Sequence, residues 1–440
     1  MSQWLNIIGV GEKGVGELPP HLRELITEAF TVIGPFRFLA GIKPIVEEVE
    51  VHPELVQQRS LEAVARALLY VDDEDVTVVE EEDLSRVLIE WQGGIDTMLG
   101  QILPLRGSPA VILATGDPMW FGIGATLAKH LEPDEFVIHS HPGAFQLAAA
   151  KLHWPIQHVA TLSLHGRPIE LIAPHILPGN RILALTTDAT TIDRVADILA
   201  NRGYGQSVIT ALENLGGVEE KITSSTAEDF NAKAIGDFYV LAVDCVADKD
   251  AVLLPPVPGL PDEAFVSDGQ LTKREVRAVT LAKLAPFPGA LLWDVGAGCG
   301  SIGIEWLRAA RDTKAVAFER DEKRLEMIAD NMRALGAPTL EIVSGEAPET
   351  FKDRAAPDAI FIGGGIANDE LFDACWEALK PGGRLVANAV TLDGEQSLIL
   401  RQELHGGDLT RIDISTLDTV GKHKVMRARL PVTQWSVTKP

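Results

Sequence analysis

Cysteine is scarce in this chain of 440 residues, and the three that occur, Cys245, Cys299 and Cys375, lie far apart. Because no C-x-x-C spacing is present, the sequence predicts neither a disulfide framework nor a metal site. Basic charge is also in short supply: 39 Lys and Arg stand against 63 Asp and Glu, for a net charge of −24. A nucleic-acid partner is therefore not expected, since neutralising phosphates requires a basic face.

Long hydrophobic runs are missing as well. No uninterrupted apolar stretch approaches the roughly 20 residues that span a bilayer, and no polybasic segment predicts binding to an anionic membrane. Residues 1–4 show no basic region ahead of an apolar run, so no secretory signal peptide is predicted. With 46% hydrophobic and 23% charged residues, the composition is typical of a globular enzyme. We expect it in the cytoplasm and away from membranes.

Proline is concentrated at one place. Four prolines fall within seven residues of the segment 254–261, Leu-Pro-Pro-Val-Pro-Gly-Leu-Pro, and such a run cannot continue a helix or a central strand. We interpret residues 251–262 as a semi-rigid linker between a domain of residues 1–250 and a domain of residues 263–440. Because the two halves share no motif, they are a fusion of different domains and not an internal repeat.

Both halves alternate short apolar runs with segments of helical periodicity, which predicts an α/β fold with parallel sheets. A change of pattern near residue 163 divides the first half into two subdomains. The strands expected in the first half are residues 5–10, 110–114, 136–138, 181–185, 207–210 and 238–243, with a helix at 144–152. Those expected in the second half are residues 290–294, 315–318, 339–343, 359–362 and 384–388, with helices from 301, at 321–335 and at 369–379.

A glycine-rich segment, residues 294–301 (Asp-Val-Gly-Ala-Gly-Cys-Gly-Ser), follows the first strand expected in the second half. Glycines at such a turn let a ligand approach the backbone at the carboxyl end of a strand. The spacing G-x-G-x-G differs from the dinucleotide fingerprint G-x-G-x-x-G, because Ser301 replaces the last glycine. Asp294, two residues before Gly296, suits the cationic amino-acid end of S-adenosylmethionine and would repel a pyrophosphate. Glu319 ends the next strand, where a carboxylate can bind ribose hydroxyls, as it also does in NAD sites.

This pattern resembles the class I, Rossmann-like methyltransferases. The resemblance implies an S-adenosylmethionine site that is formed by Asp294, Gly296, Gly298, Gly300 and Glu319, with Glu346 on the adenine side. After the fourth strand, residues 362–365 (Ile-Gly-Gly-Gly) replace the polar motif that DNA and amide methylases have there. That difference argues against methylation of an exocyclic amine, and the three glycines leave room for a bulky, flat substrate.

Three loops of the first half form a second pattern. Residues 9–14 (Gly-Val-Gly-Glu-Lys-Gly), 115–118 (Thr-Gly-Asp-Pro) and 140–143 (Ser-His-Pro-Gly) each follow an expected strand. Together they resemble the tetrapyrrole methylase family, the class III methyltransferases, in which the cofactor binds in the cleft between two α/β subdomains. His141 departs from the Ser-Ser that relatives often have, and it is expected to border the cofactor. The residues that the resemblance implies at the cofactor are Gly9, Gly11, Gly116, Asp117, Pro118 and Ser140.

Further segments narrow the resemblance to cobalamin biosynthesis. Residues 163–167 (Ser-Leu-His-Gly-Arg) and 213–217 (Glu-Asn-Leu-Gly-Gly) are similar to the branch that methylates a precorrin at a meso carbon. Residues 272–277 (Thr-Lys-Arg-Glu-Val-Arg) are similar to its decarboxylating partner. The resemblance implies two S-adenosylmethionine sites per chain. The first half would methylate carbon 5, and the second would methylate carbon 15 and release carbon dioxide from the carbon-12 acetate of ring C, to give precorrin-8.

The resemblance also supplies candidate functional residues. His165, Arg167, Lys273 and Arg274 are expected to act on the substrate, a small tetrapyrrole. Because that substrate carries many carboxylates, local bases must bind it in a protein of net charge −24. The candidates in the less acidic half are Lys273, Arg274, Arg277, Arg384, Lys422, His423 and Lys424. Relatives of the second half tend to be tetramers, which implies a homo-oligomer.

Three alternatives stay open at the level of sequence. One is that the first half belongs to a class III methyltransferase that acts on a substrate other than a tetrapyrrole, such as a protein side chain. Another is that the second half is an NAD-dependent oxidoreductase, although its glycine spacing and Asp294 argue against that. The third is that either half binds S-adenosylmethionine without doing chemistry, as a sensor or a scaffold.

Overall fold

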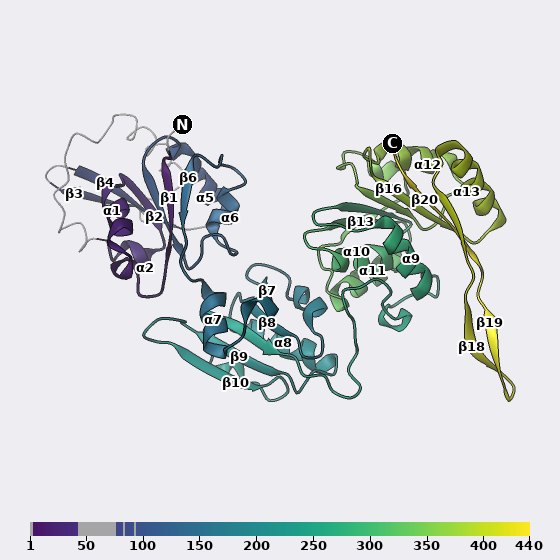
Figure 1. The fold of residues 1–440 in the computed structure, drawn as a ribbon, viewed down its shortest axis with the longest axis horizontal. Helices are drawn as coiled ribbons and strands as arrows, with labels where there is room; N and C mark the ends of the chain where they lie inside the picture. Colours follow the sequence, from purple (N-terminus) through teal and green to yellow (C-terminus); the bar gives the residue numbers. More distant parts are fainter. Residues whose placement is uncertain (1–2, 43–75, 82–83, 92–93) are drawn as a thin grey trace. The chain divides into compact units, whose positions relative to one another are not determined.

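A computed structural model describes residues 3–42, 76–81, 84–91 and 94–440 of the chain (Figure 1). Its contacts divide the chain into two compact units. The first consists of Met1–His165, Arg181–Ala196 and Ser207–Asp244, and the second of Gly166–Asn180, Asp197–Gln206 and Cys245–Pro440. The predicted boundaries at residues 250 and 263 stay a prediction. Among the described helices, none is long and apolar enough to cross a membrane.

The first unit contains two sheets, of which the first is mainly parallel. Its spatial order is β3-β4-β2-β5-β1-β6, and only β3 runs antiparallel to its neighbour. The strands are β1 (Leu5–Val10), β2 (Thr31–Gly34), β3 (Val76–Glu81), β4 (Leu84–Glu90), β5 (Ala110–Thr115) and β6 (Phe136–His139). The helices are α1 (Pro20–Glu28), α2 (Phe36–Leu39), α5 (Ile95–Ile102) and α6 (Ile123–Leu127). A separate apolar cluster covers each face of this sheet.

The second sheet of this unit is mostly antiparallel, so the prediction of parallel sheets throughout was wrong here. In the order β10-β9-β11-β8-β7, only β7 and β8 run parallel. The strands are β7 (Val159–Ser163), β8 (Arg181–Leu185), β9 (Val208–Glu213), β10 (Lys221–Thr226) and β11 (Tyr239–Asp244), and the helices are α7 (Ala144–Leu152) and α8 (Thr190–Asn201). Helix α7 packs its apolar face, with Phe145 and Ala148, against Leu183 and Leu212 of this sheet.

The second unit is built on a seven-stranded sheet of order β14-β13-β12-β15-β16-β20-β17. The first five strands are parallel, and β20 and β17 add antiparallel pairs at one edge. The strands are β12 (Leu291–Val295), β13 (Lys314–Glu319), β14 (Glu341–Ser344), β15 (Ala359–Ile362), β16 (Arg384–Ala389), β17 (Asp408–Ile412) and β20 (Val432–Thr438). The helices are α9 (Arg274–Leu284), α10 (Ser301–Ala309), α11 (Glu322–Ala334), α12 (Asp369–Ala378) and α13 (Leu392–His405).

Alternation along the strands explains why this sheet is covered on both faces. Leu292 of β12 belongs to one apolar cluster, and Trp293 and Val295 of the same strand belong to the cluster on the other face. Successive strand residues point to opposite sides, and a parallel sheet with both sides covered reads as a continuous apolar run. The predicted α/β fold is therefore confirmed, with the carboxyl ends of β12, β13 and β15 at one edge.

Candidate functional sites

The first unit contains a cavity of about 350 Å³, within the range of small-molecule sites. Loops that follow β1, β5 and β6 form one side of it, and residues of the second sheet and its loops form the other. Of the residues predicted at the first site, Gly11, Gly116, Asp117 and His165 line this cavity, together with Glu12 from the loop after β1. The structure thus brings five of the sequence motifs together, since residues of 140–143 and 213–217 also line the cavity.

Close approach of backbones explains the glycines of the first loop. A Cβ atom on Gly9 would clash with the carbonyl oxygen of Gly116 and lie 2.7 Å from the Cβ of His141. A Cβ on Gly11 would lie 2.9 Å from Cε1 of the same imidazole. His141 Nδ1 donates to the Pro142 carbonyl oxygen at 3.0 Å. These contacts fix the loops after β1, β5 and β6 against one another and shape the cavity wall.

Asp117 shapes the aromatic side of the cavity. Its Oδ1 accepts hydrogen bonds from the backbone N–H groups of Met119, at 2.7 Å, and Trp120, at 3.2 Å. This turn presents Trp120, which lines the cavity with Phe121 and Phe238 although the three rings are 43–54% exposed. Aromatic rings that stay exposed together at a cavity form a candidate contact surface for a flat, apolar ligand. The sequence analysis missed these rings because they belong to no motif.

Other predicted residues of the first half lie outside the lining. Gly9 and Pro118 are buried behind it, and Ser140 is exposed in the loop after β6. His165 lies in the lining, and its Nδ1 is 3.1 Å from the carbonyl oxygen of Thr186. A carbonyl only accepts, so Nδ1 carries the proton in this contact. Arg167 is exposed and falls in the other compact unit.

The second unit has a cavity of about 490 Å³ at the carboxyl ends of its parallel strands. Gly296 and Gly298 from the loop after β12 line it, and so does the triplet Gly363–Gly365 after β15. Gly296 and Gly298 have φ angles of 70° and 60°, where side chains other than glycine are strained. A Cβ on Gly296 would lie 3.5 Å from the N atom of Gly364, and a Cβ on Gly364 would meet nothing within 4 Å. The two loops therefore form a cradle of bare backbone.

Glu319 and Glu346 both line this cavity but differ in environment. The buried Glu319 carboxylate accepts from Gly298 N at 2.8 Å, Arg320 N at 2.9 Å and Asp321 N at 3.0 Å. Glu346 is 65% exposed and pairs with Arg320 at 2.7 Å. Arg324 also lines the cavity and pairs with Asp268 at 2.8 Å. Arg320 and Arg324 are cavity bases that the sequence analysis missed.

Asp294 and Gly300 lie behind the cradle and not in the cavity lining. Gly300 precedes α10 with a φ of 78°, and a Cβ there would lie 3.0 Å from Ile328. Asp294 is 1% exposed, and its Oδ2 accepts from Gly303 N at 2.9 Å. Burial raises the pKa of the Asp294 carboxyl to about 7, with a further rise from Glu319 that the Gly303 hydrogen bond opposes. This carboxyl thus ties the first turn of α10 to the end of β12.

Asp294 predicts a dependence of stability on pH. An unfolded Asp ionises near its ordinary pKa of 3.8, whereas the folded carboxyl holds its proton up to about 7. The folded state therefore binds more protons in this window, and stability falls as the pH rises from about 4 to 7. We expect Asp294→Asn to remove this slope and to raise the melting temperature at pH 8 by a few degrees. Scanning calorimetry of both chains from pH 5 to pH 8 measures the difference.

Histidines give the control for that measurement. Burial lowers the pKa of His139 and His175, so their contribution to stability is lost as the pH falls and has the opposite sign. Both are present in wild type and in Asp294→Asn, so their slope cancels in the difference. Equal pH profiles of the two chains would mean that Asp294 is ionised in the folded protein.

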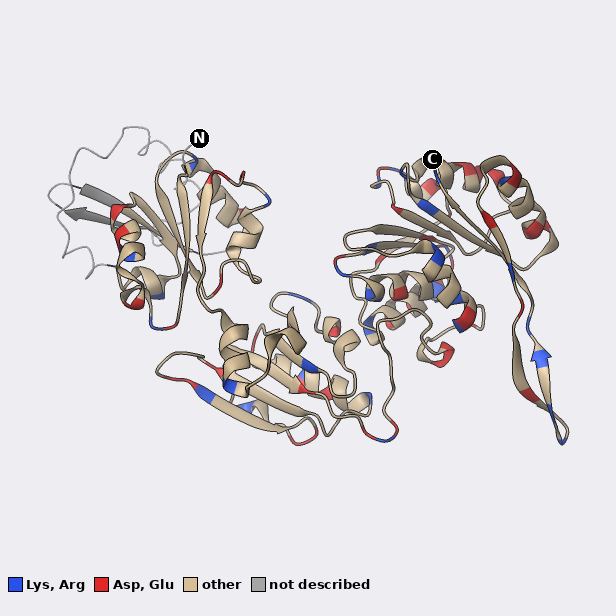
Figure 2. Ribbon diagram, viewed as in Figure 1, with Lys and Arg blue, Asp and Glu red and all other residues tan. Residues whose placement is uncertain are grey.

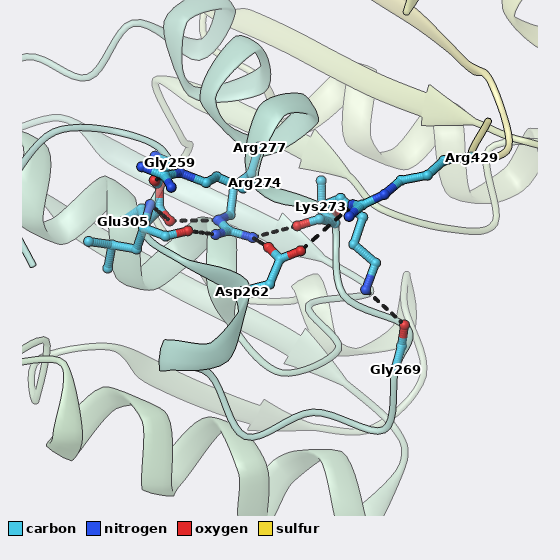
Figure 3. Close-up of polar contacts among 10 residues, drawn as sticks. Gly259, Asp262, Gly269, Lys273, Arg274, Arg277, Glu305 and Arg429 are labelled. Carbon is cyan, nitrogen blue, oxygen red and sulfur yellow. Dashed lines mark hydrogen bonds and ion pairs between the residues drawn. The ribbon is translucent and has the colours of Figure 1, made fainter. Parts of the chain in front are cut away.

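The motif that contains Lys273, Arg274 and Arg277 holds the proline-rich segment in place (Figure 3). Arg274 Nε donates to the Gly259 carbonyl oxygen at 2.7 Å, and Lys273 Nζ lies 3.4 Å from that of Gly269. Neither side chain is in the lining of the described cavity. The prediction of Arg277 as a substrate base was wrong, because its side chain is 0% exposed and is bonded to Glu305.

Glu305 is the centre of this buried network. Its carboxylate accepts from Arg277 Nε at 2.5 Å, from Gly259 N at 2.6 Å and from Leu260 N at 2.9 Å. Arg277 also donates to Asp262 at 3.2 Å and to the Leu260 carbonyl. The segment predicted as a linker is thus docked on α9 and α10 through its backbone. The remaining substrate-base candidates lie elsewhere. Arg384 is on β16, and Lys422, His423 and Lys424 are at the turn of the hairpin formed by β18 (Ser415–Val420) and β19 (His423–Ala428), on which Figure 2 colours both basic and acidic residues.

Both halves of the chain match families of methyltransferases. Residues 5–231 match the family described as Tetrapyrrole (Corrin/Porphyrin) Methylases. Residues 263–439 match the family described as Precorrin methyltransferase domain.

Relatives cover the whole chain. It is 40% identical to a precorrin-6Y C(5,15)-methyltransferase [decarboxylating] of Sinorhizobium sp, over 100% of this chain and 97% of the relative. The protein of the same name from Mycobacterium tuberculosis is 34% identical over 98% of this chain and 99% of its own. A solved structure, the C-terminal domain of precorrin-6Y C5,15-methyltransferase from Rhodobacter capsulatus, is 44% identical over 42% of this chain and all of that chain, with a TM-score of 0.41. The chain belongs to the family of these decarboxylating precorrin-6Y C(5,15)-methyltransferases.

Proposed function

We propose that this chain methylates a precorrin twice, in cobalamin biosynthesis, with S-adenosylmethionine as the methyl donor at two sites. The first half methylates carbon 5. The second half methylates carbon 15 and releases the carboxyl group of the carbon-12 acetate of ring C as carbon dioxide, so that a methyl group stays on carbon 12 and precorrin-8 is formed. The observation that carries this proposal is the pair of cavities in one chain, each lined by glycine loops after parallel strands. The full-length relatives named for both carbons support it.

The second cavity fits an adenosyl group bound against bare backbone. Gly298 and Gly364 leave its wall open, and Glu319 offers an acceptor at the end of β13. A carboxylate has about four acceptor positions, and three backbone N–H groups occupy Glu319. One position on Oε2 therefore remains for a ribose hydroxyl. Asp294 affects the cofactor site indirectly, by holding the glycine loop after β12 in place, because its carboxylate is buried beneath that loop.

The first cavity fits a flat macrocycle next to a cofactor. Its glycine loops bring Gly11 and Gly116 to one side, and Trp120, Phe121 and Phe238 supply apolar surface. His165 is the predicted catalytic residue that lines this cavity. The roles of Arg167, Lys273 and Arg274 as substrate bases, and of Pro118, Ser140 and Gly9 at the cofactor, stay predictions.

Methyl transfer depends more on the alignment of the donor methyl group with the acceptor carbon than on acid–base groups of the protein. S-adenosylmethionine supplies an electrophilic methyl group, and the bridging carbons of a reduced tetrapyrrole are nucleophilic enamines. Holding the two in line can supply several kcal/mol of the barrier. Loss of the acetate's carboxyl group as carbon dioxide leaves an electron pair on the methylene carbon, which an iminium of the macrocycle can accept. Protonation of that carbon then gives a methyl group. An NAD-dependent second half is disfavoured, because residues 263–439 match a precorrin methyltransferase domain.

Calorimetry with S-adenosylhomocysteine tests the two sites. We expect two equivalents per wild-type chain and one in each of Gly116→Val and Gly296→Val. These two glycines line the two cavities with φ angles of 66° and 70°, so valine there adds strain and bulk at one site only. Gly296→Val should also abolish the release of carbon dioxide.

The controls are Gly107→Val and Gly289→Val, whose φ angles are 89° and 81° but whose Cβ atoms would meet nothing within 4 Å. They carry the same backbone strain away from both cavities, and they should keep two equivalents. One equivalent in the wild-type chain would end the proposal of two sites and leave one half without a cofactor.

We propose that the chain forms a homo-oligomer, namely a tetramer that assembles through the second half. Exposed apolar side chains on the β18–β19 hairpin support it, among them Leu417 at 66% and Met426 at 65%. A two-stranded hairpin is only marginally stable in water by itself. Light scattering on the full chain would give the molar mass.

A further inference from the structure

Arg37, on α2, lies at the edge of the first cavity and contacts three of the residues that line it. Its Nη1 donates to both carboxylate oxygens of Glu12 at 2.8 Å, and its Nη2 donates to Thr115 Oγ1 at 3.1 Å. The guanidinium also lies over the ring of Phe238, 5.3 Å from the ring centre. Arg37 therefore joins the loops after β1 and β5 to the segment before β11.

The negative charge of the cavity lining makes a nearby arginine important for binding an anionic substrate. Glu12, Asp117 and Asp237 line it, and no Lys or Arg does among the residues that the structure describes. A substrate with several carboxylates would be repelled by such a wall unless a cation stood near it. Arg37 on α2 places a positive charge next to this wall, because it contacts the lining residues Glu12, Thr115 and Phe238.

We infer that Arg37 anchors a carboxylate of the tetrapyrrole in the first site, and that Glu12 occupies this anchor until the substrate arrives. The inference rests on the proposed function and adds a substrate subsite to it. When a side-chain carboxylate of the macrocycle reaches Arg37, it replaces the carboxylate of Glu12, so the guanidinium keeps an anionic partner throughout. The rings of Trp120, Phe121 and Phe238 then bind the flat face of the same molecule.

The geometry of the Arg37–Glu12 pair allows this exchange. The side chains are 39% and 17% exposed, and partly exposed ion pairs are held weakly. The polar contacts of Arg37 run through Nη1, to Glu12, and through Nη2, to Thr115, and Nε donates to no described residue. When Glu12 leaves, Nη1 and Nη2 can donate side by side to the two oxygens of the incoming carboxylate. Lysine lacks this fork.

Arg37→Gln tests the anchor on the full chain. We expect the KM for the precorrin in the carbon-5 methylation to rise at least tenfold, while the dissociation constant of S-adenosylhomocysteine at the first site changes less than twofold. Arg37→Lys keeps the charge without the fork and should give an intermediate KM. Arg194→Gln, an exposed arginine of α8, is the matched control and should leave the KM unchanged.

An esterified substrate distinguishes a direct contact between Arg37 and the substrate carboxylates from an indirect effect of the substitution on the KM. With the side-chain carboxylates of the macrocycle converted to methyl esters, wild type and Arg37→Gln should have the same KM. An unchanged KM in Arg37→Gln and Arg37→Lys, or an equal effect on the free acid and the ester, would overturn the anchor.

Glu12→Gln tests the exchange. Releasing Arg37 should lower the KM for the precorrin about threefold at constant kcat, and a raised KM would overturn the role of Glu12 as a stand-in. Failure of the proposed function would show differently, as wild-type chain that transfers no methyl group to carbon 5. Binding of S-adenosylhomocysteine at the first site serves as the control for folding of the first unit in every variant.

Discussion

Arg277→Met is expected to lower the free energy of unfolding of the second unit by about 3–5 kcal/mol, because breaking a buried ion pair leaves one charge without a partner. That charge is the carboxylate of Glu305, whose side chain is 2% exposed. Without Arg277, it keeps only the N–H groups of Gly259 and Leu260. The proline-rich segment should then loosen, together with Thr272, whose carbonyl oxygen accepts from Arg277 at 2.5 Å and which lines the second cavity.

Scanning calorimetry of the full chain measures the loss, and amide exchange of α9 and α10 localises it. Arg333→Met is the matched control, because Arg333 pairs with Asp330 on the surface of α11, where both side chains are 61% exposed. Such pairs contribute at most about 1 kcal/mol. The double variant with Glu305→Gln removes the stranded charge and should be more stable than Arg277→Met alone. A loss below about 1 kcal/mol in Arg277→Met would mean that the buried pair does not hold the segment.

Sequence patterns predicted most of the strands that are covered on both faces, although β2, whose four residues are all buried, was missed. Residues 5–10, 181–185 and 359–362 coincide with β1, β8 and β15, since a continuous apolar run bounded by turn residues marks such a strand. The strands β17–β20 were not predicted. They are antiparallel, and β17 to β19 carry exposed and half-buried residues throughout, so no apolar run identifies them.

The sequence predicted those parts of the candidate sites that are formed by glycines and short local motifs. The loops at Gly11, Gly116, Gly296 and Gly298 line the two cavities, because positive φ angles and close backbone approach leave a mark on the sequence. Arg37 could not be found in that way. Its partners Glu12, Thr115 and Phe238 come from distant parts of the chain, and only the fold brings them together.

Glu319→Gln is expected to weaken S-adenosylhomocysteine binding at the second site by about 10- to 100-fold. The Glu319 carboxylate accepts from three backbone N–H groups that form the turn of the cradle. Glutamine presents an NH₂ group in place of one oxygen, so at least one of these donors loses its acceptor. Hydrogen bonds to charged groups contribute about 1.5–3 kcal/mol, which corresponds to this range of affinity. The first site of the same chain gives the reference in each titration.

Two further carboxylates show whether burial decides the effect. Glu346→Gln should weaken binding less than about fivefold, because the Glu346 side chain is 65% exposed and pairs with Arg320 at the surface. Glu326→Gln, an exposed residue of α11, should leave both sites at wild-type affinity. If Glu319→Gln behaved like Glu326→Gln, the cofactor would not bind at the end of β13, and the class I interpretation of the second half would have to be abandoned. A loss at Glu319 alone, with the first site intact, would instead place the second cofactor on this cradle.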